Sequence, residues 1–454
     1  MNKFFSLSLG LVLFSGPLMS TISNYLGIDI YLQFIVLLAW ILIFIVKNNI
    51  KIYSNIVELI TANKLLSLLL VTMYIGMVVQ INPYLIFENF INLFSKEANL
   101  NVDLDQALIL ANIYYFDLAV RFIAISLLFI LVVQDISNLR NFFIGLALVT
   151  ILTAIIALGI HWENFMILCN KEGFVGFQLP SVNRADLAYK LALAFSVLYI
   201  YAIRRINFNT YFLIFFNIST FMMMISGGKG GMLIYILLMV FLAYKKNEVR
   251  LMFISFFTFI LALVLLSYTN ICDTSVYIEQ NKTRLIKGVE ARLTLIEPQI
   301  NKPLDQLEIN KPLDQLEINK PLDQLEINES NNAIAYSSKY EGTLFKSGAP
   351  SARSASGTHN FFIDLYRNFS IFSFLLILVP LFLIIGIASL RCYKDNSKVY
   401  FDTKLIFIAV LAVTFFSFTF SSYLSRNILF PLVVSLAYLI ANIKTTKQSN
   451  HDHE

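Results

Sequence analysis

The chain has 454 residues, of which 57% are hydrophobic and only 14% are charged, and its mean hydropathy is +0.71. Soluble globular proteins carry about 25% charged residues, so this composition excludes an ordinary soluble protein and indicates an integral membrane protein. The formal net charge of +5 says little about partners, and nothing in the sequence indicates nucleic-acid binding.

Twelve apolar segments are long enough to cross a bilayer, which takes about 20 residues of helix. In chain order they are residues 4–22, 29–46, 65–86, 113–133, 142–160, 187–203, 208–225, 230–244, 251–268, 370–390, 404–422 and 427–443. The first could also be a cleaved signal peptide, but no small-x-small site follows Gly16-Pro17, so we predict a retained helix. The expected fold is an all-α integral membrane protein of about twelve transmembrane helices.

Lysine and arginine predict the orientation, because short cytoplasmic loops are enriched in both. With both termini in the cytoplasm, the short outer loops hold five cations: Lys96, Lys171, Arg184, Lys229 and Arg426. The short cytoplasmic segments then hold sixteen: Lys3, Lys47, Lys51, Lys64, Arg140, Arg204, Arg205, Lys245, Lys246, Arg250, Arg391, Lys394, Lys398, Lys404, Lys444 and Lys447. We therefore predict cytoplasmic N- and C-termini, with residues 444–454 as a cytoplasmic tail.

One large outer loop, residues 269–369, separates nine helices over 1–268 from three over 370–443. Its start shows apolar residues at helical spacing among cations, which predicts either a helix on the membrane surface or a solvated helix. Residues 301–327 are three copies of NKPLDQLEI. Proline every nine residues interrupts any helix, and solenoid repeats are longer, about 20–50 residues. We interpret the repeat as a tolerated spacer.

Ionisable residues gather at the outer ends of the predicted helices. They include Asp117, Arg121, Arg184, Asp186, Lys190, Lys229, His359, Asp364 and Arg367. A coupled carrier is expected to place charges near the bilayer midplane. The distribution therefore favours a site reached from the outer leaflet.

The segment Ser226-Gly-Gly-Lys-Gly-Gly231 is the sharpest local signal. Glycines such as Gly228 and Gly230 let backbone amides approach a ligand, the following helix start attracts anions, and Lys229 adds a full charge. A phosphate or diphosphate would suit this segment, although the P-loop spacing is absent. The alternative is a tight turn between two apolar helices, with Lys229 reaching the membrane interface.

Histidine and cysteine are scarce. His359 precedes the tenth helix, where a pKa near neutrality lets it act as a general base; a cap or surface role is the alternative. Cys169 and Cys272 are both predicted on the outer side, where a disulfide is permitted, but their spacing does not show that they meet. No Cys, His or carboxylate cluster has the spacing of a metal site, and neither metal nor cofactor is predicted.

The chain resembles the O-antigen ligase and polymerase superfamily of multi-pass bacterial inner-membrane proteins. Three features carry the likeness: the predicted twelve-helix topology with its large outer loop, the segment MISGGKGGM over 224–232, and the segment THNFFIDLYRNFS over 358–370. The second is similar to the family's Ser-x-Arg-Gly turn, and the third to its His-Asn segment. The ligase branch fits best.

The resemblance implies an inverting glycosyltransferase that needs neither metal nor nucleotide. Lys229 would stand where the family has a diphosphate-binding Arg, with Arg184 and Arg292 as further basic contacts, and His359 would activate the acceptor hydroxyl. The donor would be a glycan on undecaprenyl diphosphate and the acceptor lipid A–core, in lipopolysaccharide biosynthesis. The alternatives are an O-antigen polymerase, which joins lipid-linked repeat units, and a polysaccharide flippase or exporter.

Overall fold

The computed structural model describes residues 2–26, 32–79, 119–133, 136–160, 184–201, 209–245, 247–268, 371–394, 398–420 and 428–442. All regular structure within these ranges is helical, and no strand occurs among them. The all-α class is therefore confirmed for this part of the chain. The large loop 269–369 with its repeat 301–327, Cys169 and Cys272 lie outside the described residues.

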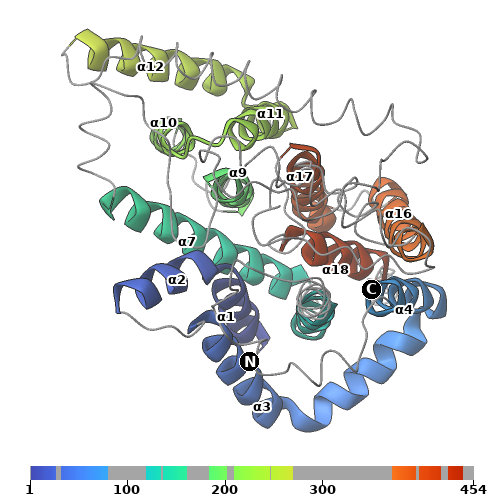
Figure 1. Cartoon of the computed structure of the whole chain (residues 1–454). Coiled ribbons are helices and arrows are strands. Elements are labelled where there is room, and N and C mark those ends of the chain that lie inside the picture. Colours follow the sequence, from blue (N-terminus) through green and yellow to red (C-terminus); the bar gives the residue numbers. More distant parts are fainter. Residues whose placement is uncertain are drawn as a thin grey trace, which may run out of the picture.

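The described helices match the twelve predicted apolar segments. The 113–133 segment is described from residue 119 onward, as the helix Ala119–Val132. The others, labelled in Figure 1, are α1 (Asn2–Phe14), α2 (Gly16–Tyr25), α3 (Leu32–Ala62), α4 (Lys64–Val78), α7 (Ile136–Ile160), α9 (Arg184–Tyr201), α10 (Asn209–Ile225), α11 (Lys229–Lys245), α12 (Val249–Tyr268), α16 (Ile371–Lys394), α17 (Lys398–Phe420) and α18 (Leu429–Asn442). In apolar surroundings a helix pairs its own backbone groups, which explains why these apolar runs are helical.

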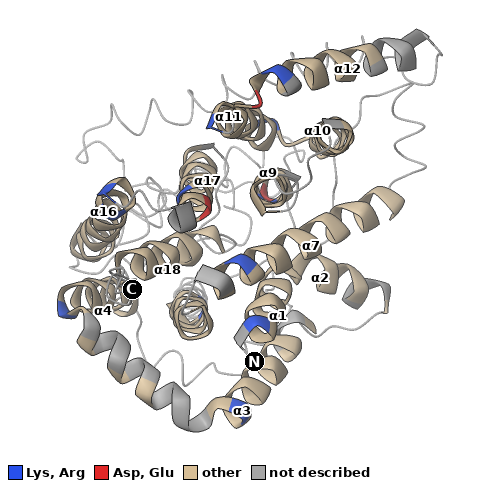
Figure 2. Cartoon of the chain, turned by 180° about the vertical axis from the view of Figure 1, so that it is seen from behind, with Lys and Arg blue, Asp and Glu red and all other residues tan. Residues whose placement is uncertain are grey.

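Length and composition mark the chain as a helical membrane protein. Three helical stretches are long and apolar enough to cross a bilayer, Asn138–Ile160, Ile371–Lys394 and Phe401–Thr419, and the bent pair α1–α2 makes a fourth if it counts as one span. Large apolar side chains such as Val46, Phe253 and Phe257 are exposed, as lipid-facing residues are. Figure 2 shows charged residues mainly near helix ends, with long uncharged stretches between them. The number of spans and the sidedness stay predictions.

Two predicted segments differ from the helices observed. The segment 4–22 is not one helix, because α1 and α2 meet at a 60° bend around Ser15. Pro17 explains the break, since it has no N–H to continue the helix and its ring clashes with the preceding turn. The second segment, predicted to end at residue 46, continues as α3 through residues 47–62, a stretch that mixes polar and apolar residues.

The helices are stacked around α9. α9 packs against α7, α11 and α17, α1 packs against α7, and α16 packs against α4 and α18. In Figure 1, α9, α10 and α11 are seen almost end-on, whereas α7 and α12 run across the view. The described helices therefore do not form one parallel bundle.

Glycines lie where helices approach most closely. A Cβ at Gly10 of α1 would overlap the Phe142 carbonyl of α7, and a Cβ at Gly145 of α7 would overlap the Leu7 carbonyl of α1. Gly76 of α4 likewise faces α16, where a Cβ would come within 2.8 Å of Leu376 Cβ. Small residues at crossings let backbones approach, which is how helices associate in membranes, where the hydrophobic effect contributes little.

Hydrogen bonds between side chains add ties across these interfaces. Ser67 of α4 and Tyr438 of α18 pair at 3.0 Å, and both oxygens lie in the protein interior. Asn217 of α10 donates to Thr258 of α12 at 3.1 Å. Such bonds between helices in apolar surroundings are worth about 0.6–2 kcal/mol each, so packing carries most of the stability.

Candidate functional site

A three-residue turn joins α10 to α11. Since α10 ends at Ile225 and α11 begins at Lys229, residues 226–228 alone reverse the chain. Gly227 has a φ of 67°, a left-handed conformation that glycine adopts without the strain of a side chain. The buried Ser226 hydroxyl donates to the Met223 carbonyl at 2.6 Å and ties the turn to the end of α10. The glycine-rich segment is thus a tight turn, as one of its two interpretations predicts.

The first turn of α11 carries a cation at its very start. The Gly228 carbonyl accepts from the Met232 N–H at 2.9 Å, so Gly228 caps the helix, and Lys229 is its first residue. The first N–H groups of a helix have no acceptor within it, and that end carries a partial positive charge. A cation there is disfavoured by about 0.3–1 kcal/mol, whereas an anion is favoured.

α9 begins in the same way. Its first residue is Arg184, and its first turn contains one carboxylate, Asp186, whose side chain is half-buried. Lys190 follows Asp186 by one turn. Residues 184–190 therefore carry two cations, Arg184 and Lys190, and one anion, Asp186. The carboxylate offsets only part of the positive charge at this helix end.

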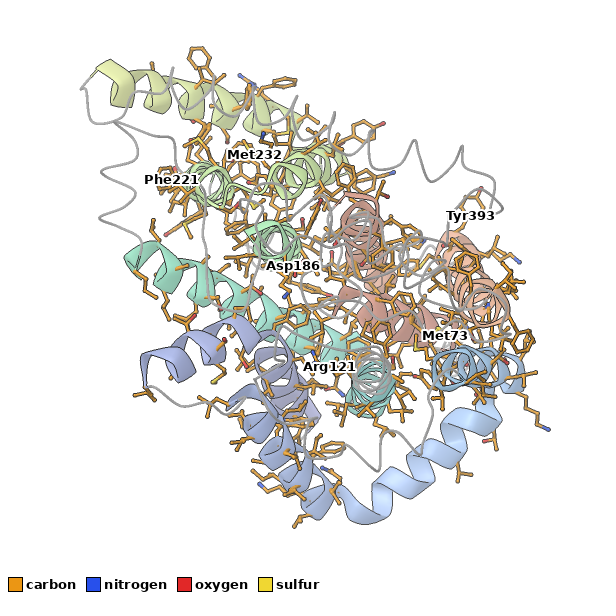
Figure 3. The ribbon with its side chains drawn as sticks, viewed as in Figure 1. Met73, Arg121, Asp186, Phe221, Met232 and Tyr393 are labelled. Carbon is orange, nitrogen blue, oxygen red and sulfur yellow. The ribbon has the colours of Figure 1, made fainter. Side chains whose placement is uncertain are left out.

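The two helix starts lie against one another. A Cβ at Gly230 would overlap the Tyr189 hydroxyl of α9, and a Cβ at Gly231 would come within 2.6 Å of the Ala188 carbonyl carbon. Farther along, the rings of Phe195 in α9 and Tyr235 in α11 lie 6.0 Å apart. α9 and α11 therefore run side by side in the same direction, with their N-termini together. Figure 3 labels Asp186 on α9 and Met232 on α11 near this junction.

This arrangement concentrates positive potential at one place. Two helix N-termini meet there, and each begins with a basic residue, Arg184 or Lys229. Hydrogen-bond donors and positive dipole ends that converge in this way favour a phosphate or diphosphate. The turn brings the start of α11 to α9, so the tight turn and the anion interpretation of the glycine-rich segment are compatible, and the anion site stays a prediction.

The predicted site residues divide into two groups. Gly228, Lys229 and Gly230 lie in the junction, and the backbone of Arg184 begins the helix that packs against them. His359 and Arg292 lie outside the described residues.

Tyr189 and Ala188 are the residues that the sequence did not single out. Tyr189 is 1% exposed, and its hydroxyl oxygen is the atom nearest to the Cβ position of Gly230. The adjacent glycines 230 and 231 signal a close backbone approach, but nothing in the sequence names the partner helix.

No group of three or more His, Cys, Asp or Glu side chains that could hold a metal ion occurs in the part of the chain that the structure describes. The comparisons with known proteins add no assignment. No protein-family model, curated protein or solved structure matches this chain.

Proposed function

We propose that the chain is an O-antigen ligase, which transfers a glycan from undecaprenyl diphosphate to lipid A–core at the periplasmic face of the bacterial inner membrane. The observation that carries the proposal is the junction of α9 and α11, where two helix N-termini lie together and one of them begins with Lys229. A lipid-linked diphosphate presents two adjacent phosphates at the membrane surface, and the two helix N-termini at the junction each offer a positive dipole end to one of them.

The proposed topology has twelve spans, with both termini in the cytoplasm and loop 269–369 in the periplasm. Contacts between helix ends support this topology, because helix ends that it assigns to the same side of the membrane contact one another. On the proposed inner side these contacts are Arg140–Tyr201, Tyr199–Glu248, Ser67–Tyr438 and Arg391–Ala441, and on the outer side Tyr189–Gly230 and Ser373–Gly76. Because α7 and α12 lie across α9 in Figure 1, the spans tilt strongly relative to one another.

In the proposed reaction an acceptor hydroxyl attacks the anomeric carbon of the donor. The new glycosidic C–O bond forms as the anomeric carbon–phosphate oxygen bond breaks, His359 accepts the hydroxyl proton, and undecaprenyl diphosphate leaves with the electron pair. Direct displacement inverts the anomeric centre. Lys229, Arg184 and the helix dipoles stabilise the negative charge that grows on the leaving diphosphate, which is the type of preorganised electrostatic assistance that lowers such barriers.

A polymerase of the same superfamily would use the same donor and differ only in its acceptor. The described residues favour neither acceptor. An exporter is the alternative of a different class, and the gathering of charge at helix ends rather than at midspan speaks against it.

The Lys229 side chain tests the proposal directly. Transfer should fall at least 100-fold in Lys229→Ala, because removal of one preorganised charge contact costs about 10²–10³ in rate. Lys229→Arg should retain activity, since it keeps the charge and can also bind phosphate bidentately. Transfer would be measured in membrane vesicles with lipid-linked donor and core acceptor, after matching the amount of inserted protein. Wild-type activity in Lys229→Ala would remove the diphosphate role.

A further inference from the structure

Tyr235 of α11 contacts two neighbouring helices. The centre of its ring lies 6.0 Å from that of Phe195 in α9 and 6.4 Å from that of Phe216 in α10. Its hydroxyl oxygen lies 2.5 Å from Oγ of Ser219 in α10 and 3.4 Å from Oγ1 of Thr220. In Figure 1 these three helices are neighbours, seen almost end-on. The Tyr235 side chain therefore joins α11 to α9 and to α10 at one point.

The Tyr235 hydroxyl belongs to a buried chain of hydrogen bonds. The Ser219 hydroxyl donates to the Phe216 carbonyl at 3.1 Å, so its oxygen is available to accept the proton of the Tyr235 hydroxyl. Tyr235 and Ser219 are both fully buried. A buried hydroxyl that loses its partner is costly, because apolar surroundings offer no water to replace it. The chain therefore holds the Tyr235 hydroxyl at one place on α10.

Tyr235 also lies on the face of α11 that packs against α9. Gly231 comes one turn earlier on the same face, and a Cβ there would overlap Cβ of Ala188 in α9. Lys229, the first residue of the helix, precedes Tyr235 by about 9 Å along the helix axis. Since the Tyr235 hydroxyl bonds to α10, its effect on the junction is to fix how α11 is placed.

We propose that Tyr235 is a positioning residue for glycan transfer. Its hydrogen bond to Ser219 and its contact with Phe195 hold α11 in the rotation that directs Lys229 to the donor diphosphate. Side chains extend about 5–6 Å from a helix axis, so a rotation of about 10° moves a side-chain end by about 1 Å. A displacement of that size can cost about 100-fold in rate. The inference rests on the proposed role of Lys229 and deepens it.

The test is a double-mutant cycle on the transfer rate, with the full chain in vesicles at matched protein levels and saturating donor. Tyr235→Phe keeps the ring and removes only the hydroxyl, and Ser219 keeps its bond to the Phe216 carbonyl. We expect a loss of about tenfold, part of the roughly 100-fold that a full 1 Å displacement can cost. In the Lys229→Ala background the same change should cost less than about twofold, because effects that act through one group do not add.

Asn217→Leu is the matched control. Asn217 lies in α10, and its amide donates to Thr258 of α12 at 3.1 Å, so the variant removes a hydrogen bond between α10 and α12 instead of the one to α11. It should lower the midpoint of thermal unfolding about as much as Tyr235→Phe does, yet leave transfer at the wild-type rate. Ser219→Ala removes the acceptor of the Tyr235 hydroxyl and should lower transfer as Tyr235→Phe does.

Three outcomes would overturn the inference about Tyr235 and leave the role of Lys229 standing. They are wild-type transfer in Tyr235→Phe, a loss in Tyr235→Phe that recurs in full in the Lys229→Ala background, and an equal loss of transfer in Asn217→Leu. Wild-type transfer in Lys229→Ala would instead remove the diphosphate role and the inference together.

Discussion

Replacement of Gly230 by alanine tests whether the α9–α11 junction positions the site. Helix propensity alone predicts that Gly230→Ala stabilises α11 by up to about 1 kcal/mol. The structure predicts the opposite, because the new methyl group would overlap the Tyr189 hydroxyl and come within 3.0 Å of its Cζ. Tyr189 is 1% exposed and cannot swing into solvent.

The cost follows from packing. Insertion of a methyl group into a well-packed interior costs about 1–3 kcal/mol, which exceeds the propensity gain. If the start of α11 moves away from α9 by about 1 Å to relieve the overlap, Lys229 moves with it, and a displacement of that size can cost about 100-fold in rate. We therefore expect a lower midpoint of thermal unfolding and a loss of transfer of about two orders of magnitude.

Combining Gly230→Ala with Tyr189→Phe shows whether the loss comes from the contact between these two residues. Tyr189→Phe removes the overlapping oxygen and leaves Cζ as the nearest atom, so it should restore part of the stability and activity of Gly230→Ala. Gly231→Ala meets the Cβ and the backbone of Ala188 instead of Tyr189, so the same Tyr189→Phe change should not rescue it. Gly159→Ala is the neutral control, because nothing lies within 4 Å of its Cβ position.

The variants would be compared for thermal unfolding in detergent and for transfer in vesicles with matched protein levels. Wild-type stability and activity in Gly230→Ala would show that the contact with Tyr189 does not position the start of α11. Rescue of Gly231→Ala by Tyr189→Phe to the same extent as Gly230→Ala would show the same.

Three further outcomes are expected. His359→Ala should lose transfer while inserting normally, as protease mapping of membranes would show; unchanged transfer would remove His359 from the mechanism. Deletion of one or two copies within 301–327 should leave transfer intact, and a stably expressed deletion without activity would contradict the spacer interpretation. Gly145→Val should lower the amount of folded protein, because any Cβ overlaps the Leu7 carbonyl, whereas Gly386→Ala, with open space around it, should behave as wild type in size-exclusion chromatography.

Apolar runs of sequence predicted the helices well, since a long apolar segment in lipid must be helical to satisfy its backbone. The break at Ser15 was missed although Gly16-Pro17 signals it: the run is apolar on both sides, so composition alone does not reveal a bend. The continuation of α3 through 47–62 was missed for the opposite reason. Lys47 and Lys51 were assigned to a short cytoplasmic segment, yet a stretch that mixes charged and apolar residues can continue a helix.

The candidate site was predictable only in part. The tight turn at 226–228 and the helix start at Lys229 follow from local sequence, because glycine and a following apolar run determine both. The contact of Gly230 with Tyr189 does not, because it depends on which helices pack together, and that is set by the whole bundle. For the same reason the contact of the Arg140 guanidinium with the Tyr201 ring, between α7 and α9, has no sequence signature.

The most direct test of the proposed ligase activity is an analysis of lipopolysaccharide from cells that lack this protein, together with the polyprenyl-linked glycan pool. A ligase predicts lipid A–core without attached glycan, while long glycan accumulates on the carrier; restoration by the wild-type chain but not by Lys229→Ala would tie the effect to the α9–α11 junction. Core capped by a single repeat unit would contradict ligation and identify a polymerase. Unchanged lipopolysaccharide would contradict both.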